Sequence, residues 1–325
     1  MSMNDSQGRT INYLRLSVTD RCNLRCQYCM PSDGIDQVSC KDILRFEDFL
    51  RIVEAATTLG VRKVRITGGE PLVRKGVIGF IQQVAQTAGI DEVTLTTNGL
   101  LLCGQAHALK SAGAQRLNVS IDSLQEENYK AITRGGDLAK VFRGLAEAEA
   151  VGLKIKLNMV VMRGVNDHEI IPFASLSQEK DWSIRFIEYM PTIREPDWKE
   201  KIVTSRDILT QLQNRFDLQP LSSGRLSGPA KPYRIAGAPG TIGIISPMSD
   251  HFCGSCNRIR ITSTGFAKSC LLDQGAVDLR PDLAAPGIEC MQKTLQRVIQ
   301  SKPPRHQLDK DLDPSTAFSM AKIGG

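Results

Sequence analysis

The first two-thirds of the chain predicts an α/β fold built around a parallel sheet. Short segments rich in β-branched residues alternate with amphipathic helical segments, and about six such strand–helix units fit before residue 190. Polar and glycine-rich motifs follow the strands at residues 67–71, 97–99 and 120–123. Parallel α/β folds bind ligands at this edge of the sheet. About six units are too few for a closed eight-fold barrel, so the pattern allows an open, partial (β/α) barrel or a doubly wound sheet.

The predicted strands are short, apolar or β-branched segments bounded by turn-forming residues. They cover residues 13–18, 63–66, 92–96, 116–120, 154–160 and 183–188. Between them, a helix is predicted from about Phe46, with apolar residues on one face and Gly60 as its stop. Another is predicted over residues 139–151, with Gly152 as its C-terminal break. The inward positions of these helices are Phe49, Ile52, Val53 and Ala56 in the first, and Val141, Leu145 and Ala148 in the second.

The composition changes after Pro191, which predicts two domains over residues 1–190 and 191–325. Residues 219–243 are rich in Gly, Pro and Ser, and this composition indicates loops with short strands. Helices are predicted on either side of this region, at about residues 206–216 and 288–300. The chain ends in a polar tail that closes with Gly324 and Gly325.

The composition also predicts a soluble, cytoplasmic protein. There are 41 Lys and Arg against 35 Asp and Glu, so the net charge of +6 is mild for 325 residues. No apolar run approaches the roughly 18–20 residues that a membrane span requires, and the polar start lacks the apolar region of a signal peptide. In a reducing compartment, clustered cysteines indicate metal or redox chemistry and not a disulfide framework. Three scattered cysteines, Cys40, Cys103 and Cys290, are interpreted as small buried side chains.

The first cysteine group is a C-x₃-C-x₂-C loop, directly after the first predicted strand. Cys22, Cys26 and Cys29 offer three thiolates, which suit three irons of a [4Fe–4S] cluster and leave the fourth iron open. An open iron can chelate a small ligand and pass it one electron. Structural zinc sites require four ligands, and no His lies close by in the sequence. An iron–sulfur site is therefore favoured over a zinc loop.

The second cysteine group consists of Cys253 and Cys256, followed by Cys270. It also supplies three thiolates, so a second cluster with an open iron is predicted. The alternative is a Cys₃His zinc site, for which His251 would be the fourth ligand. Arg258 and Arg260, in the strand-like segment between the cysteines, could recognise a polar, planar or anionic ligand beside this site.

The first loop resembles the cluster-binding motif of the radical S-adenosylmethionine (SAM) superfamily. It carries an aromatic residue, Tyr28, before the third cysteine, and Gly68-Gly69-Glu70-Pro71 resembles the motif that binds the SAM amino group. The resemblance implies a partial (β/α)₆ barrel, which fits the count of strand–helix units. It also implies that the open iron binds SAM, and that SAM is cleaved to methionine and a 5′-deoxyadenosyl radical.

The second group narrows this resemblance to the GTP 3′,8-cyclase family of molybdenum cofactor biosynthesis. The resemblance covers nearly the whole chain, from Gly8 to Gly325. It is carried by residues 252–271, and by residues 13–22, 29–31, 64–71, 185–191 and 324–325. It implies a lyase that converts GTP to (8S)-3′,8-cyclo-7,8-dihydroguanosine 5′-triphosphate. The C-terminal domain would carry a second, auxiliary [4Fe–4S] cluster.

The resemblance implies a role for each site residue. The SAM-binding cluster is expected on Cys22, Cys26 and Cys29, and the auxiliary cluster on Cys253, Cys256 and Cys270. Tyr28, Gly69, Ser120 and Met190 are expected to line the SAM pocket. Arg258, Ile259 and Arg260 would flank the guanine, and Arg15, Arg65, Thr96, Lys156 and Arg185 would face the triphosphate and ribose. The Gly324-Gly325 tail is expected to reach the active site.

The positions of the basic residues support an anionic ligand. The chain has no P-loop motif, so side chains must supply the positive charge for a triphosphate. A basic residue within an apolar strand is costly unless an anion compensates it. Each position alone could be an exposed edge, but four such strands together predict a cationic barrel interior. These positions are Arg15, Arg65, Lys156 and Arg185.

Two alternatives remain at this point. One is another radical SAM enzyme with two clusters, such as a peptide-modifying enzyme, although those usually have a more Cys-rich C-terminal region. The other is a zinc-bearing nucleic-acid-binding protein, but the basic residues are dispersed and no finger or ribbon spacing occurs. The resemblance further implies a flavodoxin- or ferredoxin-like electron donor, a downstream cyclic pyranopterin monophosphate synthase and a homodimer. Neither nucleic acid nor membrane is expected as a partner.

Overall fold

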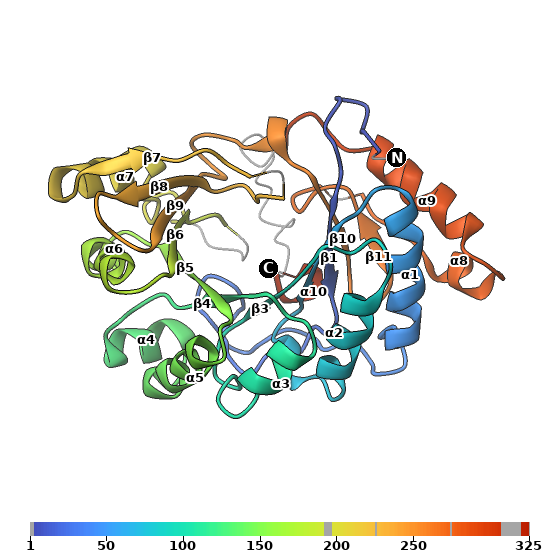
Figure 1. The fold of residues 1–325 in the computed structure, drawn as a ribbon, viewed down its shortest axis with the longest axis horizontal. Helices are drawn as coiled ribbons and strands as arrows, with labels where there is room; N and C mark the ends of the chain where they lie inside the picture. Colours follow the sequence, from blue (N-terminus) through green and yellow to red (C-terminus); the bar gives the residue numbers. More distant parts are fainter. Residues whose placement is uncertain (1–2, 192–196, 225, 274, 307–319, 325) are drawn as a thin grey trace.

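A computed structural model describes residues 3–191, 197–224, 226–273, 275–306 and 320–324. Its strands form one sheet in the order β12-β11-β10-β1-β2-β3-β4-β5-β6-β9-β8-β7. The sheet curves around a central space, and helices α1 to α6 lie on its outside (Figure 1). The predicted α/β fold and open barrel are confirmed. The strands are β1 (Tyr13–Ser17), β2 (Lys63–Thr67), β3 (Glu92–Thr97), β4 (Arg116–Ser120), β5 (Lys154–Val161), β6 (Ser183–Glu188), β7 (Leu218–Pro220), β8 (Lys231–Ile235), β9 (Thr241–Ile245), β10 (Arg258–Ile261), β11 (Phe266–Lys268) and β12 (Val277–Asp278).

The parallel part of the sheet is longer than the six predicted strands. β1 to β6 pair in parallel in chain order, β9 adds in parallel to β6, and β10 adds in parallel to β1. Antiparallel strands then finish the two edges, β8 and β7 beyond β9, and β11 and β12 beyond β10. Strands that follow residue 190 therefore extend the barrel at both of its ends.

Alternation along the strands separates an apolar outer face from a polar inner face. In β1, Leu14 and Leu16 belong to the buried core shared with the helices, whereas Tyr13 and Arg15 line the central cavity. In β6, Ile184 belongs to the same core. Successive strand residues point to opposite faces, so charged residues between apolar neighbours must face the interior. The barrel interior is consequently a polar chamber.

The helices form where the apolar spacing predicts them. α1 buries Phe49, Ile52, Val53 and Ala56, and Gly60 follows it with a φ of +95° that L side chains rarely adopt. The α5 residues predicted to face inward are also buried, and all predicted helix ends lie within a residue or two of those observed. The helices are α1 (Phe46–Thr58), α2 (Val77–Gln86), α3 (Ala106–Ser111), α4 (Glu126–Thr133), α5 (Leu138–Ala150), α6 (Ile170–Glu179), α7 (Ser205–Arg215), α8 (Arg280–Ala284), α9 (Glu289–Gln300) and α10 (Met320–Ile323), with 3-10 turns η1 (Pro71–Val73), η2 (Asp167–Glu169) and η3 (Cys253–Ser255).

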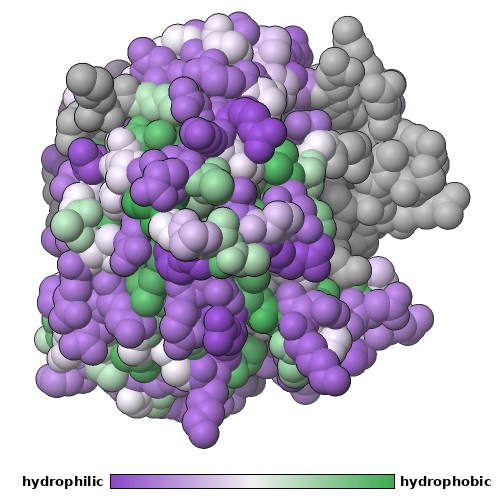
Figure 2. All heavy atoms as spheres, turned by 90° about the vertical axis from the view of Figure 1, so that its right-hand side faces the viewer, coloured by the Kyte–Doolittle hydropathy of each residue, from purple (hydrophilic) through white to green (hydrophobic). Residues whose placement is uncertain are grey.

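The C-terminal part of the chain returns to the N-terminal part. α9 packs against α1, and the Arg51 guanidinium donates to the carbonyls of Ala285 and Gly287, both at 2.7 Å. The face that carries these helices mixes hydrophilic and hydrophobic residues without a broad hydrophobic patch (Figure 2). α10 lies inside the barrel, where Figure 1 places the C-terminus. Within the described ranges, no helix combines the length and the apolar character needed to cross a bilayer.

Candidate active site

A cavity of about 280 Å³ occupies the barrel interior at the carboxyl ends of the strands. Side chains of both cysteine groups line it, together with five arginines from β1, β2, β6 and β10. The structure therefore brings two motifs that are about 230 residues apart in sequence to one chamber. The predicted site residues on its wall are Cys22, Cys26, Cys29, Cys253, Cys256, Cys270, Tyr28, Gly69, Ser120, Met190, Arg15, Arg65, Thr96, Arg185, Arg258 and Arg260.

The first cysteine loop follows β1 and is supported by hydrogen-bond donors. The Leu24 amide and the Asn98 side chain donate to the Cys22 sulfur, at 3.4 and 3.8 Å. Burial raises the pKa of the Cys26 thiol well above its usual value, and the negative charge of Asp122 raises it further. A nearby cation would be needed to hold this thiol as a thiolate. The iron of a bound cluster would supply that positive charge.

Tyr28 is fixed against the barrel wall by Asp122. The Tyr28 hydroxyl donates to Asp122 Oδ2 at 2.9 Å, and Asp122 Oδ1 accepts from the Val160 amide at 2.8 Å. Burial raises the pKa of Asp122 to about 6, although both hydrogen bonds favour its ionised form. The loop and β5 are thereby joined next to the cysteines.

The turn after β2 requires glycine at two positions. A Cβ on Gly68 would lie 2.6 Å from the Thr19 carbonyl oxygen, and one on Gly69 would lie 2.4 Å from the Arg21 carbonyl oxygen. Glu70 anchors the turn, because its carboxylate accepts from the Asn98 amide at 2.7 Å and the Thr97 hydroxyl at 2.8 Å. Burial raises the pKa of Glu70 to about 7. The turn thus packs directly on the first cysteine loop.

The second cysteine group has an electropositive setting. Burial would raise the pKa of the Cys256 thiol, but Arg258 and Lys302 lower it to about 6. Arg258 donates to the Cys256 sulfur at 3.7 Å. Burial raises the pKa of Cys253, and the charges of Cys270 and Cys256 raise it further, so the three thiols are near one another. Cys256 is therefore held ready as a thiolate ligand.

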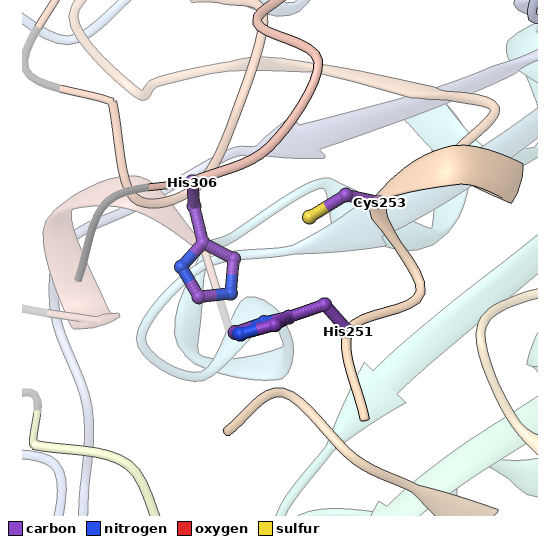
Figure 3. Close-up of side chains that lie close together, drawn as sticks. All are labelled: His251, Cys253 and His306. Atoms are coloured by element: carbon purple, nitrogen blue, oxygen red, sulfur yellow. The ribbon is translucent and has the colours of Figure 1, made fainter. Parts of the chain in front are cut away.

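His251 does not complete a Cys₃His zinc site in this structure. Figure 3 shows the His251 and His306 rings against each other beside Cys253, and one ligand atom from each of the three residues lies within 4.8 Å of the other two. In the described part of the chain, no other three His, Cys, Asp or Glu ligand atoms come this close. A single tetrahedral zinc holds its sulfurs about 3.8 Å apart. Neither cysteine trio of the described chain has its three sulfurs all within 4.8 Å of one another, so neither forms a single-ion site in this structure.

The charged residues inside the barrel are nearly all cations. Burial lowers the pKa of Arg185 to about 9, and the neighbouring positive charges of Arg65 and Arg116 add to this effect. Burial alone would raise the pKa of Tyr13, but surrounding cations, led by Arg65, lower it to about 8. Buried polar atoms without a hydrogen-bond partner among the described residues include Arg185 Nε, Thr96 Oγ1 and Asn158 Oδ1. An anionic, oxygen-rich ligand would accept hydrogen bonds from Arg185 Nε and the Thr96 hydroxyl, whereas Asn158 Oδ1 would need a donor such as a hydroxyl on that ligand.

Two predicted substrate contacts do not line this cavity. Ile259 is fully buried in the core shared with the helices, because Arg258 and Arg260 take the inward positions of β10. Lys156 faces inward but lies nearer the amino ends of the strands, where it lines a second cavity with Glu92 and Arg116. Burial lowers the pKa of Lys156 to about 6, and Arg185 contributes to this shift.

The C-terminal tail enters the barrel. Met320 lines the cavity, and the Gly324 carbonyl accepts a hydrogen bond from Arg260 Nη1 at 2.7 Å. Gly325 lies outside the described residues. The interpretation of the scattered cysteines was wrong, since Cys40, Cys103 and Cys290 are all exposed. They lie on the surface, away from the cavity wall.

The sequence analysis missed several residues of the chamber. Lys63 is 2% exposed, and it forms an ion pair with Glu92 at 2.9 Å and lies over the Tyr13 ring. Its position two residues before Arg65 on the same strand was the available signal. Lys302 and Asn158 line the cavity, whereas Lys63 contacts the wall residue Tyr13 without itself being on the wall. Lys302 had no sequence signal, because it comes from the loop after α9.

The fold and the first cysteine loop define a radical SAM protein. Residues 16–176 match the Radical SAM superfamily model, and residues 182–308 match the model described as Molybdenum Cofactor Synthesis C. The crystal structure of Streptococcus suis SuiB bound to S-adenosylmethionine has the same fold, with a TM-score of 0.63 at 15% identity. The match covers 97% of this chain and 78% of that one.

Closer relatives define the family. A protein of Geobacter sulfurreducens is 51% identical over 326 residues and covers 100% of both chains. A protein of Alkaliphilus oremlandii is 45% identical, and the match covers 99% of this chain and 100% of that protein. Both are named GTP 3′,8-cyclase. The chain belongs to the GTP 3′,8-cyclase family.

Proposed function

We propose that this chain converts GTP to (8S)-3′,8-cyclo-7,8-dihydroguanosine 5′-triphosphate, in the first step of molybdenum cofactor biosynthesis. SAM would be cleaved to 5′-deoxyadenosine and methionine in the same turnover. One observation carries the proposal: two cysteine trios and five arginines line a single cavity. A radical source, a second metal centre and a polyanion site would thus be available to one substrate molecule.

The two trios would hold the two [4Fe–4S] clusters, Cys22, Cys26 and Cys29 the first, and Cys253, Cys256 and Cys270 the second. Both are partly buried and open to the cavity. When bound, the first cluster and SAM supply one-electron chemistry that removes a hydrogen atom from the substrate. The chain itself would bind, orient and shield the reactants, since the cofactors carry the difficult step.

SAM would lie between the first cysteine loop and the carboxyl ends of β2, β4 and β6. Gly69 would present its backbone to the SAM amino group, where a side chain is sterically excluded. Tyr28, Ser120 and Met190 line the same part of the cavity and would complete this pocket. The Tyr28–Asp122 hydrogen bond would keep the aromatic ring in place.

GTP would lie with its guanine toward the second trio, between Arg258 and Arg260. Its triphosphate would meet Arg15, Arg65 and Arg185, and its ribose would lie near Thr96. Lys156, on the inward face of β5 beneath Asn158, would be neutral in the substrate-free protein and would take up a proton when the triphosphate binds, adding positive charge below it. Ile259 would contribute through packing that orients its two arginine neighbours. The Gly324–Gly325 tail would close the chamber and exclude water.

The wider setting of the enzyme is part of the proposal. We infer a cytoplasmic enzyme, a flavodoxin- or ferredoxin-like electron donor, a homodimer and a downstream cyclic pyranopterin monophosphate synthase. We also retain the division into a barrel segment, residues 1–190, and a C-terminal segment, residues 191–325. The two family models support two segments, but one ends at residue 176 and the other begins at residue 182, before the proposed boundary.

A peptide-modifying enzyme is the competing function, because SuiB, which has a similar fold, has also been crystallised bound to a precursor peptide, SuiA. At 15% identity that similarity concerns the fold alone. The cationic chamber, with unsatisfied buried atoms on Arg185 and Thr96, favours a triphosphate over a peptide.

Anaerobic turnover with GTP deuterated at ribose carbon 3′ tests the proposed function. The protein would be reconstituted with iron and sulfide and supplied with SAM and dithionite. Mass spectrometry should detect deuterium in 5′-deoxyadenosine together with an isomer of GTP. SAM cleavage without deuterium transfer would exclude GTP as the substrate and favour the peptide-modifying alternative.

A further inference from the structure

Arg9 joins the start of the chain to two segments near the second cysteine trio. Its side chain is nearly buried and is held by Asp5 at 2.5 Å. Its Nη1 donates to the Cys253 carbonyl at 2.9 Å, and its Nη2 donates to the Lys302 and Pro303 carbonyls at 3.2 and 2.9 Å. One guanidinium therefore ties the Cys253 turn to the loop after α9.

Lys302 continues this connection toward the other two cysteines. Its side chain is also nearly buried, and its Nζ donates to the Arg258 carbonyl at 2.9 Å and the Ser269 carbonyl at 2.5 Å. Arg258 follows Cys256 by two residues, and Ser269 directly precedes Cys270. The Lys302 side chain also lines the same cavity as Cys256 and Cys270.

Each cysteine of the trio is thus fixed through a backbone carbonyl that one of these two cations binds. The three cysteines come from two segments: Cys253 and Cys256 lie at the two ends of the η3 turn, and Cys270 lies two residues after β11. A cluster needs all three sulfurs at set separations at the same time. Partners outside the ligand set commonly provide such orientation.

Resting on the proposed function, we propose that Arg9 and Lys302 are positioning residues for the second iron–sulfur cluster. They hold the two cysteine-bearing segments in place before iron binds, and Lys302 would place a positive charge beside the bound cluster. Net charge and hydrogen bonds near the sulfurs set the reduction potential of such clusters. Lys302 therefore acts on potential as well as on assembly.

The test compares Arg9→Met and Lys302→Met with Arg51→Met after anaerobic reconstitution. Arg51 is a matched control, because its guanidinium also binds backbone carbonyls of the C-terminal segment, but none next to a cysteine. Iron content, electron paramagnetic resonance spectra, the potential of each cluster and GTP-independent SAM cleavage are measured. Lys302→Arg and Arg9→Lys restore a cation and serve if the methionine variants fold poorly.

Wild type and Arg51→Met should hold about eight irons per chain, whereas Arg9→Met and Lys302→Met should hold about four. SAM cleavage without GTP should stay within about twofold of wild type, since it depends on the first trio. Lys302→Arg should recover the iron but shift the potential of the second cluster only. Two outcomes would overturn this inference and leave the proposed function standing. One is eight irons with unchanged potentials in every variant, and the other is an iron loss in Arg51→Met equal to that in Arg9→Met and Lys302→Met. Four irons in the wild type would overturn the second cluster of the proposed function as well.

Discussion

Arg260 Nη1 donates a hydrogen bond of 2.7 Å to the carbonyl oxygen of Gly324, and the contact is buried inside the barrel. The contact joins β10 to the end of the chain. Gly324 has a φ of +85°, and a Cβ there would lie 2.6 Å from Thr67 Cγ2 and 3.0 Å from Ser17 Cβ. The tail is therefore seated against β1 and β2, beside the cavity.

We expect Gly324→Ala to reduce GTP turnover by at least about tenfold while both clusters still assemble. The added methyl group would collide with Thr67 and displace the tail. Gly237→Ala is the control, since Gly237 has a similar φ of +77° but no atom within 4 Å of a Cβ. Deletion of Gly324 and Gly325 should abolish turnover altogether. Full activity in the deletion variant would contradict a role for the tail.

We expect Arg185→Met to weaken GTP binding by about 10- to 150-fold. Arg185 is buried with an unsatisfied Nε, so its guanidinium has a hydrogen bond to give to a triphosphate, and such charged bonds contribute about 1.5–3 kcal/mol. Equilibrium binding of GTP under anaerobic conditions measures the effect. Arg143→Met, at an exposed position on α5, should bind GTP like the wild type. Equal affinities for the two variants would remove Arg185 from the substrate site.

We expect Lys156→Met to stabilise the substrate-free protein at pH 7. Burial lowers the folded pKa of Lys156 to about 6, against 10.5 when unfolded, so the unfolded state binds a proton that the folded state lacks. This site makes stability rise with pH between about 6 and 10.5, by up to about 1.4 kcal/mol per pH unit. The variant should lose that rise.

Denaturant unfolding at several pH values measures the Lys156 effect. Lys154→Met provides the comparison on the same strand, because Lys154 is mostly exposed in its ion pair with Asp181. Its removal should change stability little. A parallel loss of pH dependence in both variants would show that burial of Lys156 is not the cause.

We expect Cys26→Ala and Cys256→Ala to separate the two halves of the chemistry. Cys26→Ala should eliminate 5′-deoxyadenosine formation, because the first trio would no longer hold its cluster. Cys256→Ala should retain SAM cleavage but form no cyclised GTP. Chromatography of both products distinguishes these outcomes, and Cys290→Ala, at an exposed position, should resemble the wild type. Cyclised GTP from Cys256→Ala would exclude an essential second cluster.

The sequence predicted the local elements well and the edges of the barrel poorly. β1 to β6 have the predicted positions because their alternating residues have one apolar and one polar face. β9 and β10 were not predicted as barrel strands, since their partners β6 and β1 lie far away in the sequence. Short segments such as 258–261 carry no local sign of such pairing.

The candidate site shows the same division between local and distant information. Cys22, Cys26 and Cys29 were recognisable from their spacing, and Lys63 could have been found from strand periodicity. Lys302 and Arg9 could not, because their roles depend on carbonyl groups of distant segments. Ile259 was placed by resemblance alone, and Lys156 by resemblance and by its position within an apolar strand. Alternation and depth in the barrel place both side chains off the cavity wall.

The parallel pairing of β1 with β10 also determines when the barrel can fold during synthesis on the ribosome. Tyr13 pairs with Arg258, about 245 residues later in the chain. A ribosome that adds roughly 5–20 residues per second needs roughly 12–50 seconds to supply that partner. Until then, one edge of the first strand stays open, and the loop with Cys22, Cys26 and Cys29 exists before its chamber. The barrel is completed only when synthesis is nearly finished.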